Sequence, residues 1–206
     1  MKPKSNSQLL VAPQWLLGLF VLWFWAQTPE SRAQSTESIP LASVTGGTLT
    51  LSQAVGEKKA LVVLFYSNHC IYARNYEERV ARLVRRFANE PVAFVLVNAN
   101  NPRVTPDEGI EELKAQLERM GITVPYLVDA NRQLAARFGI TLNPEAIILR
   151  ANTSGRMTQV YKGRIDDSPL SVEGVKIPNL ELAIESTLSG VGVPGPGGAT
   201  TGCPFR

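Results

Sequence analysis

The feature that most constrains the fold of this chain is a continuous apolar run, Ala60 to Tyr66 (ALVVLFY), with turn-forming residues on both sides. An apolar run of this length without alternation is typical of a strand that is buried on both faces of a sheet. Such a strand needs helices on both faces of its sheet, and a chain of 206 residues is long enough to supply them. A hydrophobic content of 44% also excludes a disordered protein.

The rest of the chain predicts alternating helices and strands around this run. Tyr76, Val80 and Phe87 follow it at helical spacing and form one apolar stripe of a helix. Further strands are predicted at 92–98, 124–128, 146–149 and 157–161, and further helices after Thr105, after Asn131 and at about 179–189. This order predicts an α/β fold with one central mixed sheet flanked by helices on both faces.

The helix after Thr105 carries strong end signals. Thr105, Pro106 and Glu108 fit the N-cap, N1 and N3 positions of a capping box. Gly121 fits the residue that ends a helix in the left-handed conformation. We therefore expect Glu108 to act as a helix cap.

The first 33 residues have the pattern of an export signal. Two lysines precede an apolar run from Trp15 to Ala26, and Ser31-Arg32-Ala33 places small residues at a plausible cleavage position. We expect a cleaved signal peptide over 1–33, which places the protein in the periplasm or outside the cell, where disulfides persist. An uncleaved membrane anchor is the alternative.

The remainder of the chain divides into three parts. Residues 34–48 are rich in Ser, Thr and Gly and are predicted to be a linker, and residues 49–189 form the folded domain. Residues 190–206 are predicted to be a flexible Gly/Pro-rich tail that carries Cys203. The coil before this cysteine has a root-mean-square span of about 20 Å. Cys203 could therefore return to the domain surface or reach a second subunit.

Charge and cysteine content exclude several classes of function. The formal net charge of +3 becomes +1 once residues 1–33 are set aside, so the charge balance gives no reason to expect a nucleic-acid partner. With two cysteines and one histidine, the chain cannot form a four-cysteine zinc site or a histidine cluster. We expect no metal and no cofactor, which leaves thiol chemistry.

Cys70 directly precedes the predicted helix and follows the buried strand closely. The unpaired N–H groups and the dipole at a helix N-terminus favour a thiolate over a thiol. A thiolate is the form that attacks peroxides and disulfides, so this position suits a nucleophile. The alternative is a small buried apolar residue at a strand end.

Several motifs resemble those of known redox proteins. Phe138 to Leu149 (FGITLNPEAIIL) is similar to the thioredoxin segment in which a cis-proline precedes a hairpin. Asn68-His69-Cys70, Gly163 to Asp167 (GRIDD) and Gly202-Cys203 resemble, in the same order, motifs of exported redoxins of the peroxiredoxin and thiol-specific antioxidant branch. The resemblance covers roughly residues 50 to 188 and implies a thioredoxin-like fold.

The resemblance also implies roles for individual residues. Cys70 matches the nucleophile, and Pro144 matches the cis-proline, which would turn the backbone of Asn143 toward the thiol and offer main-chain pairing to a substrate. Ser67 keeps a hydroxyl at the spacing of the peroxiredoxin Thr-x-x-Cys motif, where it could bond the thiolate or a peroxide oxygen. Peroxiredoxins also have an arginine that accompanies this hydroxyl and cysteine, and Arg164 is the candidate for it here. The alternative is that Arg164 is a solvated surface arginine.

The chain departs from both patterns at specific positions. Thioredoxins have Cys-x-x-Cys, but Ala73 occupies the fourth position here, so no neighbouring thiol can resolve a mixed disulfide. Leu64 replaces the buried acid of thioredoxins, and Val63 replaces the proline of peroxiredoxins. His69 could support the thiolate as an imidazolium or could serve packing alone.

Three functions agree with these residues. The first is reduction of peroxides, in which Cys70 becomes a sulfenic acid, Cys203 condenses with it to a disulfide, and a second redox protein reduces that bond. The second is thiol–disulfide exchange with exported proteins. The third is a non-catalytic module in which a Cys70–Cys203 disulfide is a permanent staple. We expect the first function. Contact with a membrane is expected only if the N-terminal segment stays uncleaved. Whether the two cysteines pair within one chain or between two chains stays open.

Overall fold

The computed structural model describes residues 35–152, 156–195 and 198–206, so the predicted signal peptide lies outside the described residues. The helices are η1 (Thr36–Ser38), α2 (Leu51–Val55), α3 (Ile71–Arg86), η2 (Pro106–Glu108), α4 (Ile110–Met120), α5 (Gln133–Phe138) and α6 (Asn179–Ser189). The strands are β1 (Leu41–Ser43), β2 (Thr48–Leu49), β3 (Ala60–Phe65), β4 (Val92–Asn98), β5 (Tyr126–Val128), β6 (Leu142–Asn143), β7 (Glu145–Ala151), β8 (Met157–Gly163) and β9 (Cys203–Pro204). In this part of the chain, no helix is long and apolar enough to cross a membrane.

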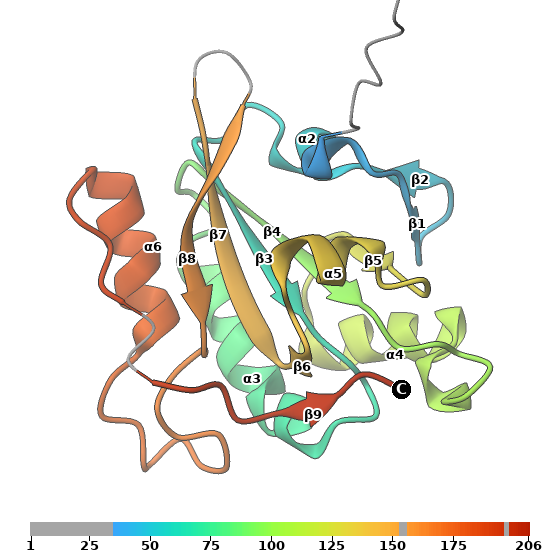
Figure 1. Ribbon diagram of the computed structural model, residues 1–206. Coiled ribbons are helices and arrows are strands. Elements are labelled where there is room, and N and C mark those ends of the chain that lie inside the picture. The colour runs from blue at the N-terminus through green and yellow to red at the C-terminus, as the bar shows by residue number, and fades with distance from the viewer. Residues whose placement is uncertain (1–34, 153–155, 196–197) are drawn as a thin grey trace, which may run out of the picture. The chain divides into compact units, whose positions relative to one another are not determined.

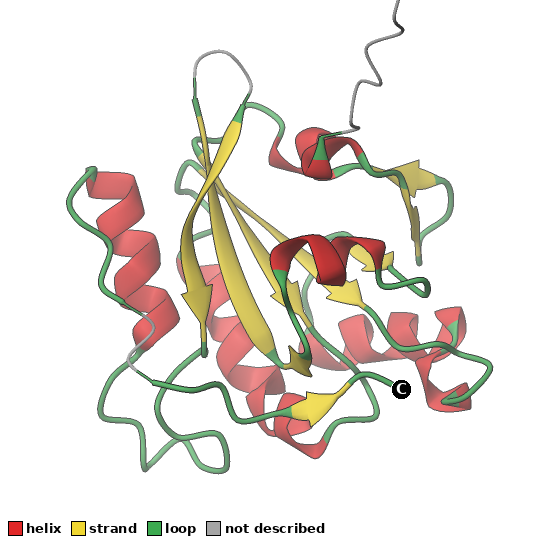
Figure 2. Cartoon of the chain, viewed as in Figure 1, coloured by secondary structure: helices red, strands yellow, loops and turns green. Residues whose placement is uncertain are grey.

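A mixed sheet forms the centre of the domain, with the strand order β2-β1-β5-β4-β3-β7-β8 and helices on either side (Figures 1 and 2). β3 runs parallel to β4 and antiparallel to β7, and all of its residues are buried. The sequence prediction of an α/β fold with a mixed sheet between helices is therefore confirmed.

Side chains of β3 alternate between two hydrophobic clusters, because successive residues of a strand point to opposite faces of the sheet. Val62 and Leu64 belong to the cluster formed with α3, α4 and α6. Leu61, Val63 and Phe65 belong to the cluster formed with α2 and α5. Burial on both faces explains why the sequence of β3 is an uninterrupted apolar run. It also fixes the position from which the loop to Cys70 starts.

The predicted linker at 34–48 is corrected by the structure. β1 pairs antiparallel with β2 and with β5, and Ile39, Leu41 and Val44 are buried. The prediction was wrong because β1 is only three residues long and its polar neighbours dominate the local composition. One of its two partner strands, β5, comes from a distant part of the chain, which a local pattern cannot reveal.

The C-terminal segment, predicted to be a flexible tail, forms contacts along the lower end of the sheet in Figure 1. β9 pairs antiparallel with β6, and Asn143 lies opposite Cys203. The ring of Phe205 packs beside that of Phe65, with 6.4 Å between the centroids. The end of the tail is therefore held against the domain at the same edge as Cys70.

Candidate functional site

Cys70 is the N-cap residue of α3 and is 1% exposed. Its Sγ forms a disulfide with the Sγ of Cys203, which lies 133 residues later in the same chain. The chain has two cysteines, and both take part in this bond. The pairing that the sequence left open between one chain and two is therefore intrachain in this structure.

Ser67 lies in the turn before Cys70 and is buried with it. The backbone N–H of Cys70 donates to Ser67 Oγ at 3.1 Å, so the serine closes the turn that starts α3. The hydroxyl and the sulfur therefore belong to the same turn. The predicted bond from this hydroxyl to a thiolate or a peroxide oxygen stays a prediction.

The segment around Pro144 lies against the disulfide. The Asn143–Pro144 peptide bond is cis, as the sequence indicated, and the carbonyl oxygen of Asn143 lies 3.3 Å from Cys70 Sγ. Asn143 Nδ2 donates to the carbonyl oxygen of Cys203 at 3.1 Å. The backbone edge that was expected to receive a substrate is thus occupied by the protein's own tail.

Gly202 explains why a glycine precedes the second cysteine. A Cβ atom at this position would overlap the backbone of Asn143, because β9 passes directly over β6 there. A larger residue would have to move one of the two backbones. The Gly202-Cys203 pair is therefore the sequence signature of a close approach between the tail and the segment before Pro144.

Glu108 has a role that the sequence analysis missed. The predicted capping box is wrong, because Thr105 makes no capping bond, α4 begins at Ile110, and Gly109 is its N-cap. The Glu108 side chain turns inward instead and is 1% exposed. Its carboxylate accepts the backbone N–H groups of Asn68 at 3.0 Å and His69 at 2.8 Å. The only clue in the sequence is an acid shortly before a helix, and that clue equally fits a cap.

Two asparagine side chains complete the surroundings of this carboxylate. Asn98 Nδ2 donates to one oxygen of Glu108, and Asn100 Nδ2 donates to the other at 3.0 Å. Both asparagines are almost fully buried, at the end of β4 and just beyond it. With the N–H groups of Asn68 and His69, the carboxylate has four donors. Buried acids are tolerated when they are satisfied in this way.

The Asn68-His69 part of the motif is held by further polar contacts. Asn68 Oδ1 accepts from Arg119 at 2.8 Å, and the Asn68 carbonyl accepts from Arg74 Nε at 2.7 Å. His69 Nδ1 lies 2.9 Å from Asp107 Oδ2. Asn68 thus orients the loop, while His69 pairs with a carboxylate. The predicted support of a thiolate by His69 stays a prediction.

A cavity of about 300 Å³ lies beside the disulfide, and Ser67, His69, Cys70, Asn143 and Cys203 are among the residues that line it. Asn100 and Arg206 also line this cavity, although neither was singled out from the sequence.

Arg164, the arginine expected to accompany Cys70, does not line this cavity. Its Nε donates to Asn179 Oδ1 at 3.0 Å, and its side chain lines a separate small pocket with Pro144.

The GRIDD segment anchors α3 rather than the cysteines. Asp166 accepts hydrogen bonds from Tyr76 Oη at 2.7 Å and Arg79 Nη1 at 2.6 Å, and the pair with Arg79 is buried. The backbone N–H groups of Ile177 and Lys176 bond Asp167 and hold the pKa of its carboxyl below the ordinary value of 3.8. Both aspartates therefore organise the loop between β8 and α6.

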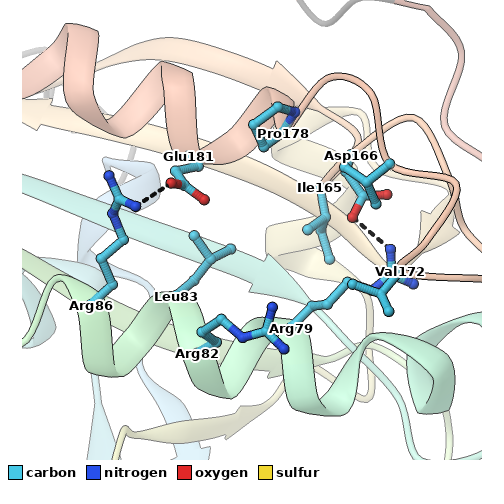
Figure 3. A pocket seen from close by; sticks show the side chains of 10 residues that line it. Arg79, Arg82, Leu83, Arg86, Ile165, Asp166, Val172, Pro178 and Glu181 are labelled. Atoms are coloured by element: carbon cyan, nitrogen blue, oxygen red, sulfur yellow. Dashed lines mark hydrogen bonds and ion pairs between the residues drawn. The ribbon is translucent and has the colours of Figure 1, made fainter.

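Figure 3 shows Arg79 and its partner Asp166 in a pocket of about 150 Å³ that is lined by α3, the loop between β8 and α6, and Glu181 of α6. Each of the three arginines at this pocket has an acidic partner. Arg86 pairs with Glu181, as the second dashed line shows, and Arg82 pairs with Glu78. These ion pairs neutralise the positive charge at the pocket. The pair between Arg86 and Glu181 also links α3 to α6.

We expect Tyr76→Phe to destabilise the protein by about 1–2 kcal/mol, because the substitution removes a hydrogen bond to a buried carboxylate. Burial and the bond to Asp166 raise the pKa of the Tyr76 phenol, so the hydroxyl remains a donor at neutral pH. Urea unfolding measures the effect. Tyr72→Phe on the same helix is the control, and equal losses in both variants would contradict the assigned bond.

Glu145 is a second buried acid near the tail. It follows Pro144 at the start of β7, it is 9% exposed, and Oε1 accepts from Thr200 Oγ1 at 3.2 Å. Burial raises the pKa of this carboxyl above the ordinary value of 4.5, while Lys162 and the Thr200 bond oppose the rise. The folded protein therefore holds this proton more tightly than the unfolded chain does.

The raised pKa of Glu145 sets a sign for the pH dependence of stability. Well below pH 4.5 the carboxyl is protonated in both states, and as the pH rises past 4.5 it ionises in the unfolded chain before it ionises in the folded protein. We expect wild type to lose stability relative to Glu145→Gln as the pH rises through the folded-state pKa. Urea midpoints of both proteins between pH 4 and 8 measure the difference, and a relative gain for wild type would contradict the assignment.

Comparisons with known proteins agree with this architecture. A family model described as the AhpC/TSA family matches residues 27–154. A hypothetical protein from Sinorhizobium meliloti 1021 is 28% identical, over 82% of this chain and 87% of that one, with a TM-score of 0.67. An uncharacterized conserved protein from Geobacillus kaustophilus is 26% identical, over 82% and 89%, with a TM-score of 0.71.

A more distant structure has a similar fold. The bacterioferritin comigratory protein of Xanthomonas campestris is 16% identical, over 76% of this chain and 93% of that one, with a TM-score of 0.52. A search of curated proteins found no match. With the family match and the strand order, these likenesses confirm the thioredoxin-like fold that the motifs implied.

Proposed function

Because the chain belongs to the AhpC/TSA family of thiol-based redox proteins, we propose that it reduces peroxides through Cys70, with Cys203 as the resolving thiol. The observation that carries the proposal is the bond between a cysteine at a helix N-terminus and a cysteine on the C-terminal tail. Ala73 occupies the position where a neighbouring resolving thiol would stand, so the tail is the source of the second thiol.

The proposed reaction has three balanced steps. The Cys70 thiolate attacks one oxygen of the peroxide, the O–O bond breaks, and the alkoxide or hydroxide that leaves takes up a proton. The product on Cys70 is a sulfenic acid, which the Cys203 thiol attacks to form the disulfide and release water. An external dithiol protein then supplies two electrons and two protons and restores both thiols.

The residues around Cys70 support the first step. The start of α3 favours a negative charge on sulfur, and the turn that holds Cys70 also holds the Ser67 hydroxyl. Export, which the N-terminal segment favours, belongs to the same proposal because it supplies a compartment where disulfides form.

A second function, exchange with protein disulfides, is favoured by one observation. β6 already pairs with an extended segment that contains a cysteine, so the same edge suits the backbone of a protein substrate once the tail leaves it. In that reading the substrate and Cys203 compete for the same position. A Cys203→Ser variant would then accumulate mixed disulfides with client proteins.

Peptide mapping after oxidation tests the proposed function. The fully reduced protein is mixed with stoichiometric hydrogen peroxide, quenched between seconds and minutes, and mapped without reduction by mass spectrometry. We expect a sulfenate on Cys70 to appear first and a Cys70–Cys203 disulfide to replace it. Slow formation of the disulfide without a trappable sulfenate would overturn peroxide reduction and leave exchange or a permanent staple.

A further inference from the structure

Arg206, three residues after Cys203, contacts a part of the domain that also holds the Cys70 loop. The backbone N–H of Arg206 donates to Asn100 Oδ1 at 2.8 Å, and the N–H of Asn101 donates to the carbonyl of Arg206 at 2.8 Å. The chain end is therefore bonded to the loop after β4, in addition to the β6–β9 pairing at Cys203.

Asn100 makes a second bond on its other side. Its Nδ2 donates to Glu108 Oε1 at 3.0 Å, and the same oxygen accepts the N–H of His69 at 2.8 Å. The route from the residue before Cys70 to the end of the tail therefore passes through Glu108 and Asn100. Asn100 is 3% exposed, and its own N–H donates to Asn98 Oδ1, which fixes its backbone.

We propose that Asn100 is a positioning residue for the resolving step, because its amide bonds both Glu108, which holds the Cys70 loop, and the end of the tail. The proposal rests on the proposed role of Cys203 as the partner of Cys70. A thiol on a flexible linker has an effective concentration on the order of millimolar toward its partner. Bonds that dock the segment beyond Cys203 raise this value, since they restrict where its thiol can go.

The bonds between Asn100 and the tail determine the direction in which the reduction potential of the disulfide should shift. The bonds to Arg206 are made when the tail is docked, and water replaces them when the reduced tail leaves. Their loss therefore weakens the oxidised form relative to the reduced form. For Asn100→Ala we expect the equilibrium constant for disulfide formation to fall about tenfold, as for the loss of one buried hydrogen bond. Tenfold corresponds to a reduction potential about 30 mV less negative.

The experiment equilibrates the full chain with glutathione redox buffers and measures the oxidised fraction. Asn101→Ala is the matched control, because its side chain accepts the N–H of Arg103 and its own N–H remains. Arg206→Pro removes the N–H that Asn100 accepts, whereas Arg206→Ala keeps it. We expect the reduction potential to become less negative in Asn100→Ala and in Arg206→Pro. The potentials of the two controls, Asn101→Ala and Arg206→Ala, should not change.

The double variant Asn100→Ala with Arg206→Pro separates positioning from a merely structural role. If Asn100 acts through Arg206, the double variant should shift no further than the larger single shift. Additive shifts, or an unchanged potential in Asn100→Ala, would overturn the inference. Failure of the proposed function looks different: the wild type would then form no sulfenate with peroxide, whatever the potentials of the variants.

Discussion

Cys70→Ser is expected to abolish peroxide consumption, with a fall in rate on the order of 10³-fold or more, as when other catalytic nucleophiles are removed. A serine hydroxyl at this position would hardly ionise near neutral pH and is a poor nucleophile without an adjacent base. The other thiol of the chain, on Cys203, belongs to the tail and lacks the helix N-terminus that favours a thiolate. It therefore does not substitute for Cys70.

The matched variant for this prediction is Cys203→Ser. Its Cys70 keeps the α3 N-terminus and the turn with Ser67, so the first reaction with peroxide should proceed near the wild-type rate. The sulfenate should then persist, because no second thiol of the chain can condense with it. Peroxide loss and sulfenate trapping are measured in both variants. Full peroxide consumption by Cys70→Ser would reject Cys70 as the nucleophile.

Glu108→Ala is expected to cost about 3–5 kcal/mol of unfolding free energy, because several buried hydrogen-bond donors lose their shared acceptor. The substitution leaves the N–H groups of Asn68 and His69 and the amides of Asn98 and Asn100 without their acceptor. Each unsatisfied buried donor costs about 1–3 kcal/mol unless water reaches it. The loop that carries Cys70 should therefore lose its fixed position.

Urea unfolding of the oxidised and reduced proteins measures this cost. Glu118→Ala is the control, because Glu118 is an exposed acid of α4 and such substitutions usually change stability by less than about 0.5 kcal/mol. Glu108→Gln should fall between the two, since its amide oxygen can still accept while its NH₂ group faces donors. A loss below about 1 kcal/mol in Glu108→Ala would mean that the four bonds contribute little.

Several features of the fold and of the site follow from local sequence patterns. β3, β4 and α6 were predicted within a residue or two because an uninterrupted apolar run and a helical stripe are local patterns, set by the two faces of a strand and the turn of a helix. Cys70 was found for the same reason, since a cysteine before a helix is visible in a short window. The cis peptide bond at Pro144 was expected from a motif of adjacent residues.

Other features were missed because their causes are distant in the chain. β1 looked like a linker until β5 supplied its hydrogen bonds. Glu108 looked like a helix cap, and its four donors come from the loop after β3, from the end of β4 and from Asn100 just beyond it. Arg164 followed a motif, but the fold directs its guanidinium to Asn179 instead of the sulfur atoms.

The sequence by itself determined the central strands of the sheet, the flanking helices and the position of Cys70 before a helix, because each follows from periodicity or from adjacent residues. Only the tertiary structure decided that Cys203 pairs within the chain, that β9 occupies the edge of β6, and that Glu108 and Asn100 join the two cysteine segments. The physical reason is that these contacts join residues from 8 to 133 positions apart. Their geometry exists only after the sheet has brought the loops after β3 and β4 to the same edge.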